Sequence, residues 1–383
     1  MPPLRARVRD ALLMILVATG LSGCLSAESW EAVRVLEDIE AGPGPSALKR
    51  TTPAPDRREV SYTIDGRRHV GDLYTPGQPA GGRLILIPGF TAAGKDDPRV
   101  IALADSLGRA RFRVLVPDIP GSRDLRVRAA DARVIADAVR YFAAAGAAGD
   151  DRPLGIAAIS YAVGPAIMAS LLDGVGDKVD FVLALGGYHD TTAVITFMTT
   201  GGYRDRPAAA GQRAREWQFA APYPASKWIF LAGNAEALDA PTDRAVLRAL
   251  AERRAADPDA PIDDLVPRLG PPGRALLDLM VNRDPDRVAA LIGRLPAPVR
   301  REIDALSLAP LDLGPLAGKL ILIHGRADRM IPYTESRALA AAAGDAELFL
   351  VEGFSHIEPA TVGWRGRLTL IDAMQALLHR RRF

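Results

Sequence analysis

The stretch LGIAAISYAVGPAIMASLL, residues 154–172, joins an apolar strand to a helix through a single serine. The apolar run before the serine predicts a buried strand, and Pro165 suits the first turn of the helix that follows. Ser160 stands at the turn between them, where the two backbones pass close together and small neighbours are needed. Ala158 and Ala162 hold the two flanking places where glycine is usual. The stretch by itself leaves open two interpretations, an exposed nucleophile and an ordinary helix-capping serine.

The rest of the chain alternates apolar runs with helical patterns. A hairpin is predicted around Asp65 and Gly66, because two alternating runs flank this Asp-Gly pair. Six apolar runs then predict buried parallel strands, at residues 84–87, 113–116, 154–159, 181–185, 320–323 and 348–351. Helical spacing of apolar residues predicts helices at 124–145, 164–172 and 334–343. This order predicts an α/β fold with a mostly parallel, doubly wound sheet, whose ligands bind at the carboxyl ends of the strands.

One interval interrupts this alternation. Residues 190–305 carry helical patterns without a clear strand, and they are too many for a loop. We interpret them as a helical cap inserted between two parts of one core, residues 59–189 and 306–383. A separate C-terminal domain is the alternative, but the run LILIHGRAD, which starts at Leu320, resumes the strand pattern.

A catalytic serine needs a base and an acid, and the chain has five histidines from which to choose the base. His356 follows the last predicted strand in LFLVEGFSH, whereas His324 ends the strand before it. Asp328 lies on the loop after that penultimate strand, in HGRADRMIP. Ser160, Asp328 and His356 therefore each follow a different parallel strand, in the chain order serine, acid, histidine.

With these residues in place, the sequence resembles the α/β-hydrolase superfamily over residues 59–383. ISYAVG matches its nucleophile turn, HGRADRMIP its acid loop and EGFSH its histidine loop, and the insertion falls where the superfamily places its variable cap. The chain departs from the pattern at the two alanines beside the serine and at Pro88, where many members have a histidine. The resemblance implies a Ser160, Asp328 and His356 triad. Asp190, after an earlier strand, is the alternative acid, because some relatives place the acid there.

The segment RLILIPGFTAAGKDD, residues 83–97, has the outline of a phosphate-binding loop. Asp96 stands where such a loop needs a serine or threonine for magnesium, so we exclude a nucleotide site. The resemblance instead makes this segment the oxyanion loop, with the backbone N–H of Phe90 as one donor and Thr91 as the near alternative. The second donor is the N–H of Tyr161. Lys95 is interpreted as a surface or loop-ordering residue and not as a catalytic one.

The N-terminus has the pattern of an export signal. Residues 1–23 hold the basic stretch RARVR and the apolar run ALLMILVATGL, which is short for a membrane span. LSGC, residues 21–24, resembles the lipobox of bacterial lipoproteins, and Cys24 is the only cysteine of the chain. The resemblance implies lipid on Cys24 and, from Leu25, the outer membrane, with the body facing the periplasm. Residues 24–58 are predicted to form a Pro- and Gly-rich tether. An uncleaved anchor helix is the alternative.

The net charge and the motifs together limit the partners and activities that we expect. The formal net charge is +2, and the signal segment carries all of it, so the remaining chain is neutral and its charge gives no case for nucleic acid as a partner. The expected activity is hydrolysis of a small-molecule acyl ester through an acyl-enzyme, which needs no metal or organic cofactor. An acyltransferase with the same triad and a non-catalytic binding lipoprotein of the envelope remain alternatives. Substrate choice is assigned to the cap, where Trp217, Tyr223 and Trp228 line either an acyl pocket or the cap's own core.

Overall fold

The computed structural model describes residues 26–126, 128–145, 151–205, 216–356 and 362–382. The predicted signal segment and Cys24 lie outside the described residues, so both stay predictions.

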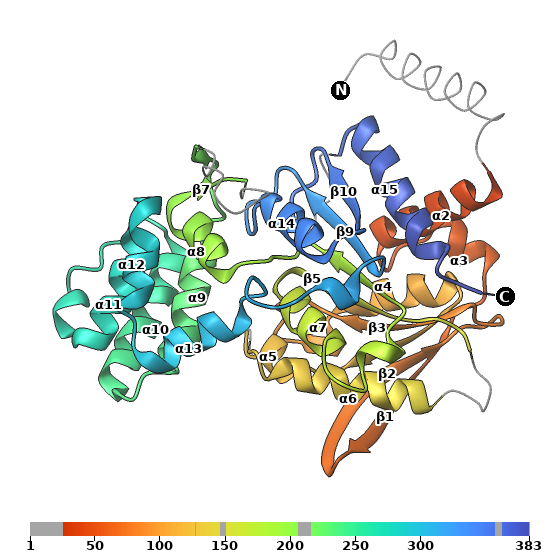
Figure 1. Ribbon diagram of the computed structural model, residues 1–383, viewed down its shortest axis with the longest axis horizontal. Helices are drawn as coiled ribbons and strands as arrows, with labels where there is room; N and C mark the ends of the chain where they lie inside the picture. The colour runs from red at the N-terminus through yellow and green to blue at the C-terminus, as the bar shows by residue number, and fades with distance from the viewer. Residues whose placement is uncertain (1–25, 127, 146–150, 206–215, 357–361, 383) are drawn as a thin grey trace.

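An eight-stranded sheet forms the centre of the molecule, in the order β1-β2-β4-β3-β5-β6-β9-β10 (Figure 1). The strands are β1 (Asp56–Ile64), β2 (Arg67–Thr75), β3 (Gly82–Ile87), β4 (Phe112–Pro117), β5 (Leu154–Ile159), β6 (Phe181–Leu185), β9 (Leu320–Gly325) and β10 (Glu347–Val351). Strand β2 pairs antiparallel with both of its neighbours, and all other pairs are parallel. Each of the six apolar runs predicted as a parallel strand is one, and the predicted hairpin is β1 and β2.

Helices cover both faces of the sheet. They are α4 (Pro98–Arg109), α5 (Pro120–Arg123), α6 (Asp131–Ala144), α7 (Val163–Ser170), α14 (Thr334–Ala343) and α15 (Trp364–Leu378). Successive residues of β3 point to opposite faces, so Ile85 and Ile87 pack with α6 and α7, whereas Leu84 and Leu86 pack with α4 and α15. Burial on both faces explains why the parallel strands are continuous apolar runs.

The helix predicted at 124–145 is shorter than expected. The chain forms α5 and then turns at Leu125, whose φ is 52°, before α6 begins at Asp131. A leucine in the left-handed region cannot continue a right-handed helix, so the periodic pattern there extends beyond the helix itself.

The short 3₁₀ helices are η1 (Gly94–Asp96), η2 (Ser160–Ala162), η3 (Gly176–Lys178), η4 (Val266–Arg268), η5 (Pro285–Arg287) and η6 (Gly314–Leu316).

The segment predicted as a tether is largely folded against the body, which corrects that prediction. Residues 27–51 form α2 (Ala27–Ala41) and α3 (Ala47–Thr51), and α2 packs against α15 and α4. Ala32 and Val35 of α2 are fully buried in the core on that face of the sheet. The Pro- and Gly-rich residues 42–45 form only the turn between the two helices. Their composition therefore indicated a break in helix, not a free linker.

The inserted helices form a layer of their own at one end of the sheet (Figure 1). They are α8 (Thr191–Thr200), α9 (Ser226–Ala235), α10 (Pro241–Ala256), α11 (Pro271–Val281), α12 (Val288–Gly293) and α13 (Ala297–Leu306), with a short strand pair β7 (Gly202–Tyr203) and β8 (Gln218–Phe219). These helices share a separate apolar core, in which Trp228 is buried. The chain enters and leaves this layer at one place, because the N–H of Leu308 donates to the carbonyl of His189 at 2.9 Å.

Candidate active site

Ser160 occupies a strained turn between β5 and α7. Its φ is 60°, in the left-handed region that non-glycine residues seldom adopt, and its side chain is buried. The alanines at positions 158 and 162 therefore do not prevent the sharp turn that the sequence predicted. Such strain is kept only where surrounding structure enforces it, and it is typical of functional sites.

The structure brings together the three residues that the sequence placed after different strands. The Nε2 atom of His356 lies 2.9 Å from Oγ of Ser160, and its Nδ1 lies 2.8 Å from Oδ2 of Asp328. An ionised carboxylate only accepts hydrogen bonds, so Nδ1 carries the proton and Nε2 accepts from the serine hydroxyl. In this tautomer the imidazole is oriented to receive the serine proton.

Asp328 is held ionised inside the protein. Burial alone would raise the pKa of this carboxyl, but hydrogen bonds from His324 and His356 outweigh it and keep the pKa well below its ordinary value. Its Oδ1 also accepts the N–H groups of Met330 and Ile331, at 2.7 and 3.0 Å. The carboxylate is therefore fixed in position and available to stabilise a charged His356.

A second histidine, His324, helps to hold Asp328 in position. It is fully buried, and its Nε2 donates to the carbonyl of Ile331 at 2.9 Å and lies 3.4 Å from Oδ2 of Asp328. Its Nδ1 then accepts from the Ser336 hydroxyl at 2.6 Å. Both ring nitrogens are used in the interior, so His324 is placed to position the acid and does not contact Ser160.

Asp190, the alternative acid, has a structural role at the start of the cap. Its Oδ1 accepts the N–H of Thr192 at 2.6 Å and so caps α8. Its own N–H and that of His189 donate to the buried carboxylate of Glu335 on α14, at 2.7 and 3.0 Å. The carboxylate that contacts His356 is that of Asp328.

The loop after β3 passes directly beside Ser160. A Cβ atom on Gly89 would lie 3.5 Å from the Cβ of Ser160. The rings of Phe90 and Tyr161, whose N–H groups are the predicted oxyanion donors, stack with centroids 5.2 Å apart. Ser122, which the sequence analysis did not single out, donates its hydroxyl to the Gly89 carbonyl at 2.5 Å. Only the fold brings Ser122 to this loop, so no local pattern could have revealed it.

Further along the same loop, Lys95 is buried among carboxylates. Its Nζ lies 3.1 Å from Glu59, 3.2 Å from Asp72 and 3.2 Å from Asp96. The lysine is thus occupied in holding the loop to β1 and β2, as predicted, and a polyphosphate would meet these acidic groups.

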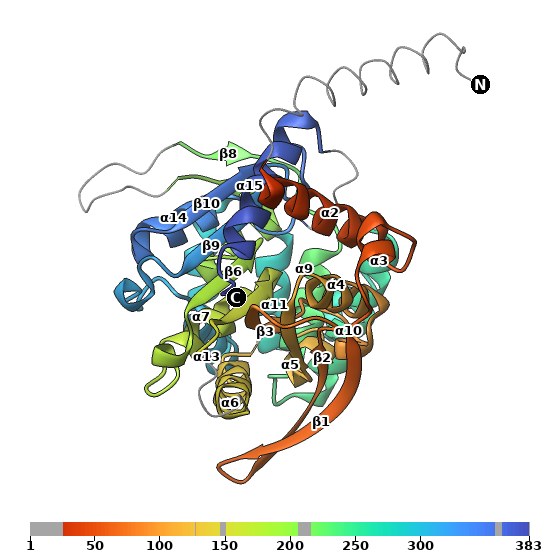
Figure 2. The same ribbon diagram turned by 90° about the vertical axis from the view of Figure 1, so that its right-hand side faces the viewer.

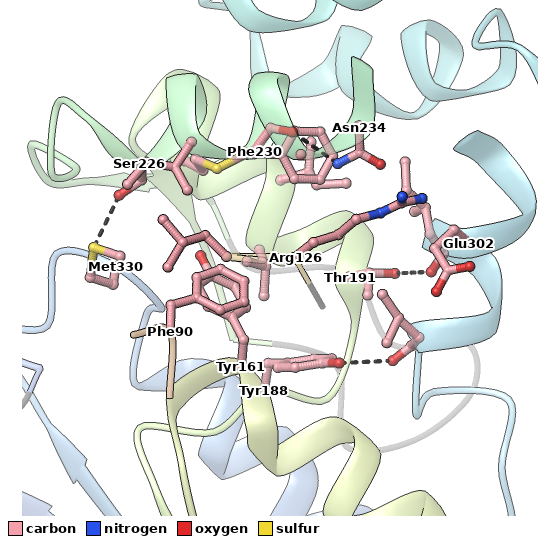
Figure 3. A pocket seen from close by; sticks show the side chains of 18 residues that line it. Phe90, Arg126, Tyr161, Tyr188, Thr191, Ser226, Phe230, Asn234, Glu302 and Met330 are labelled. Atoms are coloured by element: carbon pink, nitrogen blue, oxygen red, sulfur yellow. Dashed lines mark hydrogen bonds between the residues drawn. The ribbon is translucent and has the colours of Figure 1, made fainter. Parts of the chain in front are cut away.

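A cleft opens between the core and the cap next to the serine. It encloses about 810 Å³, its solvent-open mouth included. The Phe90 and Tyr161 rings line one end, and apolar side chains of α8, α9 and α13 cover most of the rest (Figure 3). Arg126 reaches across it towards Glu302, and the Nε of Arg126 is buried without a hydrogen-bond partner among the described residues. Trp217, Tyr223 and Trp228 are not among the lining residues.

The sheet order and the placement of the cap define the α/β-hydrolase fold, as the sequence predicted. A candidate hydrolase from Legionella pneumophila shares it, with a TM-score of 0.53 at 13% identity over 87% of this chain and 92% of its own. Lower TM-scores, 0.43 and 0.44, relate the chain to a dienelactone hydrolase from Anabaena variabilis and an α/β hydrolase from a Penicillium species. Those two are 14% and 15% identical, over 86% and 85% of this chain and 99% of theirs. The sequence matches no protein-family model and no curated protein.

Proposed function

We propose that this protein is a serine hydrolase that cleaves a carboxylic ester through an acyl-enzyme. The observation that carries the proposal is the continuous hydrogen-bond chain from Asp328 through His356 to Ser160, at 2.8 and 2.9 Å. Serine and histidine in hydrogen-bond contact, with a third group orienting the base, is the geometry of an activated nucleophile. Tyr161, the residue after the serine, lines the cleft between core and cap, and we infer that a substrate reaches the serine from that cleft.

We assign each step of the proposed reaction to a group of the site. The Nε2 of His356 takes the proton of Ser160 as its oxygen attacks the ester carbonyl, and Asp328 stabilises the resulting imidazolium. The N–H groups of Phe90 and Tyr161 stabilise the negative oxygen. The imidazolium then gives its proton to the departing alcohol, leaving the acyl group on the serine. Water attacks this ester with His356 again as base, releasing the acid and restoring the serine.

The cleft favours an ester with an apolar part. Most of its lining comes from aliphatic and aromatic side chains, such as Val194, Ile229, Phe230 and Leu306. Burying an alkyl chain against them contributes about 0.8 kcal/mol per CH₂ group. We therefore favour carboxylic esters of apolar acids or alcohols as the substrate class.

The proposal includes attachment of the enzyme to the cell envelope. Export is directed by residues 1–23, and lipid on Cys24 anchors the mature chain to the outer membrane with its folded body in the periplasm. The support is the LSGC sequence at residues 21–24 and the absence of any other cysteine in the chain.

A fluorophosphonate probe tests the activated serine without knowledge of the substrate. We expect stoichiometric labelling of the parent chain, and loss of labelling in Ser160→Ala and in His356→Ala. His379→Ala is the matched control, because His379 is exposed on the far end of α15 and should label normally. Absence of labelling in a folded parent chain, shown by its circular dichroism, would contradict the proposal. Retention of labelling in Ser160→Ala would show that the probe reacts with another residue.

A further inference from the structure

Exposed large apolar side chains lie on elements along one side of the molecule. Among the large apolar side chains that the structure describes, Trp30, Phe219 and Trp364 are 48, 62 and 69% exposed, and Leu368 is 47% exposed. Trp30 is in the first turn of α2, Phe219 is in β8, and the other two are in the first turns of α15. The starts of α2 and α15 lie on the upper side of the molecule in Figure 1, and Figure 2, which labels β8, shows that strand on the same side. The exposed side chains are spread along this side, because the start of α2 packs against Gln375, near the opposite end of α15 from Trp364. We call the three aromatic side chains and Leu368 the aromatic face.

The described chain begins on this same side. Cys24 precedes the first residue of α2 by three positions, so these residues span at most about 10 Å even when fully extended. A lipid on Cys24 would therefore hold the start of α2 close to the membrane surface. The longer tether that the composition suggested would have left the orientation of the body free.

Helix α2 is rigidly joined to the body. Glu31 forms a two-point ion pair with Arg381, at 2.6 and 2.7 Å, and Gln375 of α15 donates to the Ser29 hydroxyl at 3.0 Å. The buried carboxylate of Asp38 in α2 accepts hydrogen bonds from Lys49 of α3 and from Ser106 of α4. Because the anchor is short and α2 does not move independently, the anchor restricts which side of the folded protein can face the bilayer.

We propose that the aromatic face rests on the lipid bilayer to which Cys24 attaches the protein; this inference depends on the proposed lipid anchor. Tryptophan favours the boundary between headgroups and acyl chains, where its ring is apolar and its N–H stays hydrated. Exposed Arg365 and Arg367 follow Trp364 at the start of α15, and the Arg365 guanidinium lies over its ring, 5.1 Å from the centroid. Two exposed cations at this end of the helix suit anionic headgroups. Within the described residues, no helix has the length and apolar character to cross a bilayer.

Fluorescence on vesicles tests which side faces the bilayer. The lipidated full chain, carrying Trp364→Cys or Phe219→Cys labelled with the fluorophore NBD, is reconstituted into phosphatidylethanolamine and phosphatidylglycerol vesicles that contain nitroxide-labelled lipid. Leu172→Cys is the matched control, 40% exposed in the parent chain. It follows α7, which lies away from the upper side in the two views. We expect at least twofold stronger quenching at positions 364 and 219 than at position 172.

The following results would overturn the proposed membrane orientation. Equal quenching at all three positions, or stronger quenching at position 172, overturns it. The proposal is also overturned if the chain does not float with the vesicles. It is likewise overturned if NBD labels the parent chain, because a reactive Cys24 carries no lipid and the anchor is then absent. Fluorophosphonate labelling in the same samples reports on Ser160 separately, so failure of the membrane orientation and failure of the proposed hydrolase are distinguishable. Should Trp364→Cys not fold, Leu368→Cys probes the same turn of α15.

Discussion

At the scale of single residues, the proposed oxyanion loop depends on a side chain that has no part in the proposed chemistry. The hydroxyl of Ser122 donates to the Gly89 carbonyl at 2.5 Å. In a trans peptide the C=O of one residue and the N–H of the next point in opposite directions within one plane. A hydrogen bond that fixes the Gly89 carbonyl therefore also fixes the direction of the Phe90 N–H. Ser122 is thus a positioning residue for the proposed oxyanion donor.

We expect Ser122→Ala to lower kcat about tenfold on a p-nitrophenyl ester while KM changes less than about twofold. A misdirected donor acts on the transition state more than on the bound ester, and losing such a donor outright costs about 10²–10³ in rate. Ser170→Ala is the control, since that hydroxyl also donates to a backbone carbonyl, within α7. Ser122→Thr should restore the rate. An unchanged kcat in Ser122→Ala, or an equal loss in Ser170→Ala, would contradict the role of Ser122.

At the scale of the elements, close packing beside Ser160 requires a glycine in the first turn of α7. A Cβ atom on Gly164 would meet Oη of Tyr188 at 1.9 Å. Tyr188 is nearly fully buried and donates its hydroxyl to the carbonyl of Leu306 at 3.1 Å, where the cap rejoins the core. Glycine is therefore required at position 164, whereas the turn at Ser160 forms with alanines on both sides.

Gly164→Ala should destabilise the protein by about 3 kcal/mol, because the buried ring of Tyr188 must move and its hydrogen bond is strained. Thermal unfolding followed by circular dichroism measures the change. Gly293→Ala, at the end of α12, is the control, because nothing lies within 4 Å of its added Cβ; its stability should stay equal or rise by up to about 1 kcal/mol. A Gly164→Ala variant with the parent melting temperature would show that α7 and Tyr188 are not packed as described.

At the scale of the whole molecule, the N-terminal helices belong to the folded unit. Asp38 of α2 is completely buried and accepts from Ser46, from Lys49 at 2.7 Å and from Ser106 of α4 at 2.6 Å. Burial raises the pKa of this carboxyl, but the hydrogen bonds from Lys49, Ser106 and Ser46 outweigh it and lower the pKa below its ordinary value. One carboxylate thus ties α2, α3 and α4 together.

Removing that carboxylate should destabilise the whole protein. We expect Asp38→Ala to cost about 3 kcal/mol of unfolding free energy, because it leaves buried donors without an acceptor. Glu37→Ala, on the exposed side of α2, should change it by less than about 0.5 kcal/mol. Since folding lowers the pKa of Asp38, its contribution is present above about pH 4 and is lost as the pH falls further. Urea unfolding across this range measures both effects, and equal stability of the two variants would restore the tether interpretation.

The elements and their order follow from the sequence, because their signals are local. Strands buried on both faces need continuous apolar runs, and each predicted run is a strand of the sheet. The carboxyl ends of parallel strands meet at one edge, so chain order alone predicts that Ser160, Asp328 and His356 come together. The structure places these three side chains in hydrogen-bond contact.

Tertiary structure decides what depends on partners distant in the chain. The sequence offers Asp190 and Asp328 as acids, and only the packed fold shows Asp328 on His356 and Asp190 capping α8. The packed fold likewise brings Ser122 to Gly89, and it places α2 against α15 where the composition suggested a tether. The physical reason is common to all three: a hydrogen bond or a buried contact between remote segments leaves no periodic pattern in either segment, and it exists only once the chain has packed.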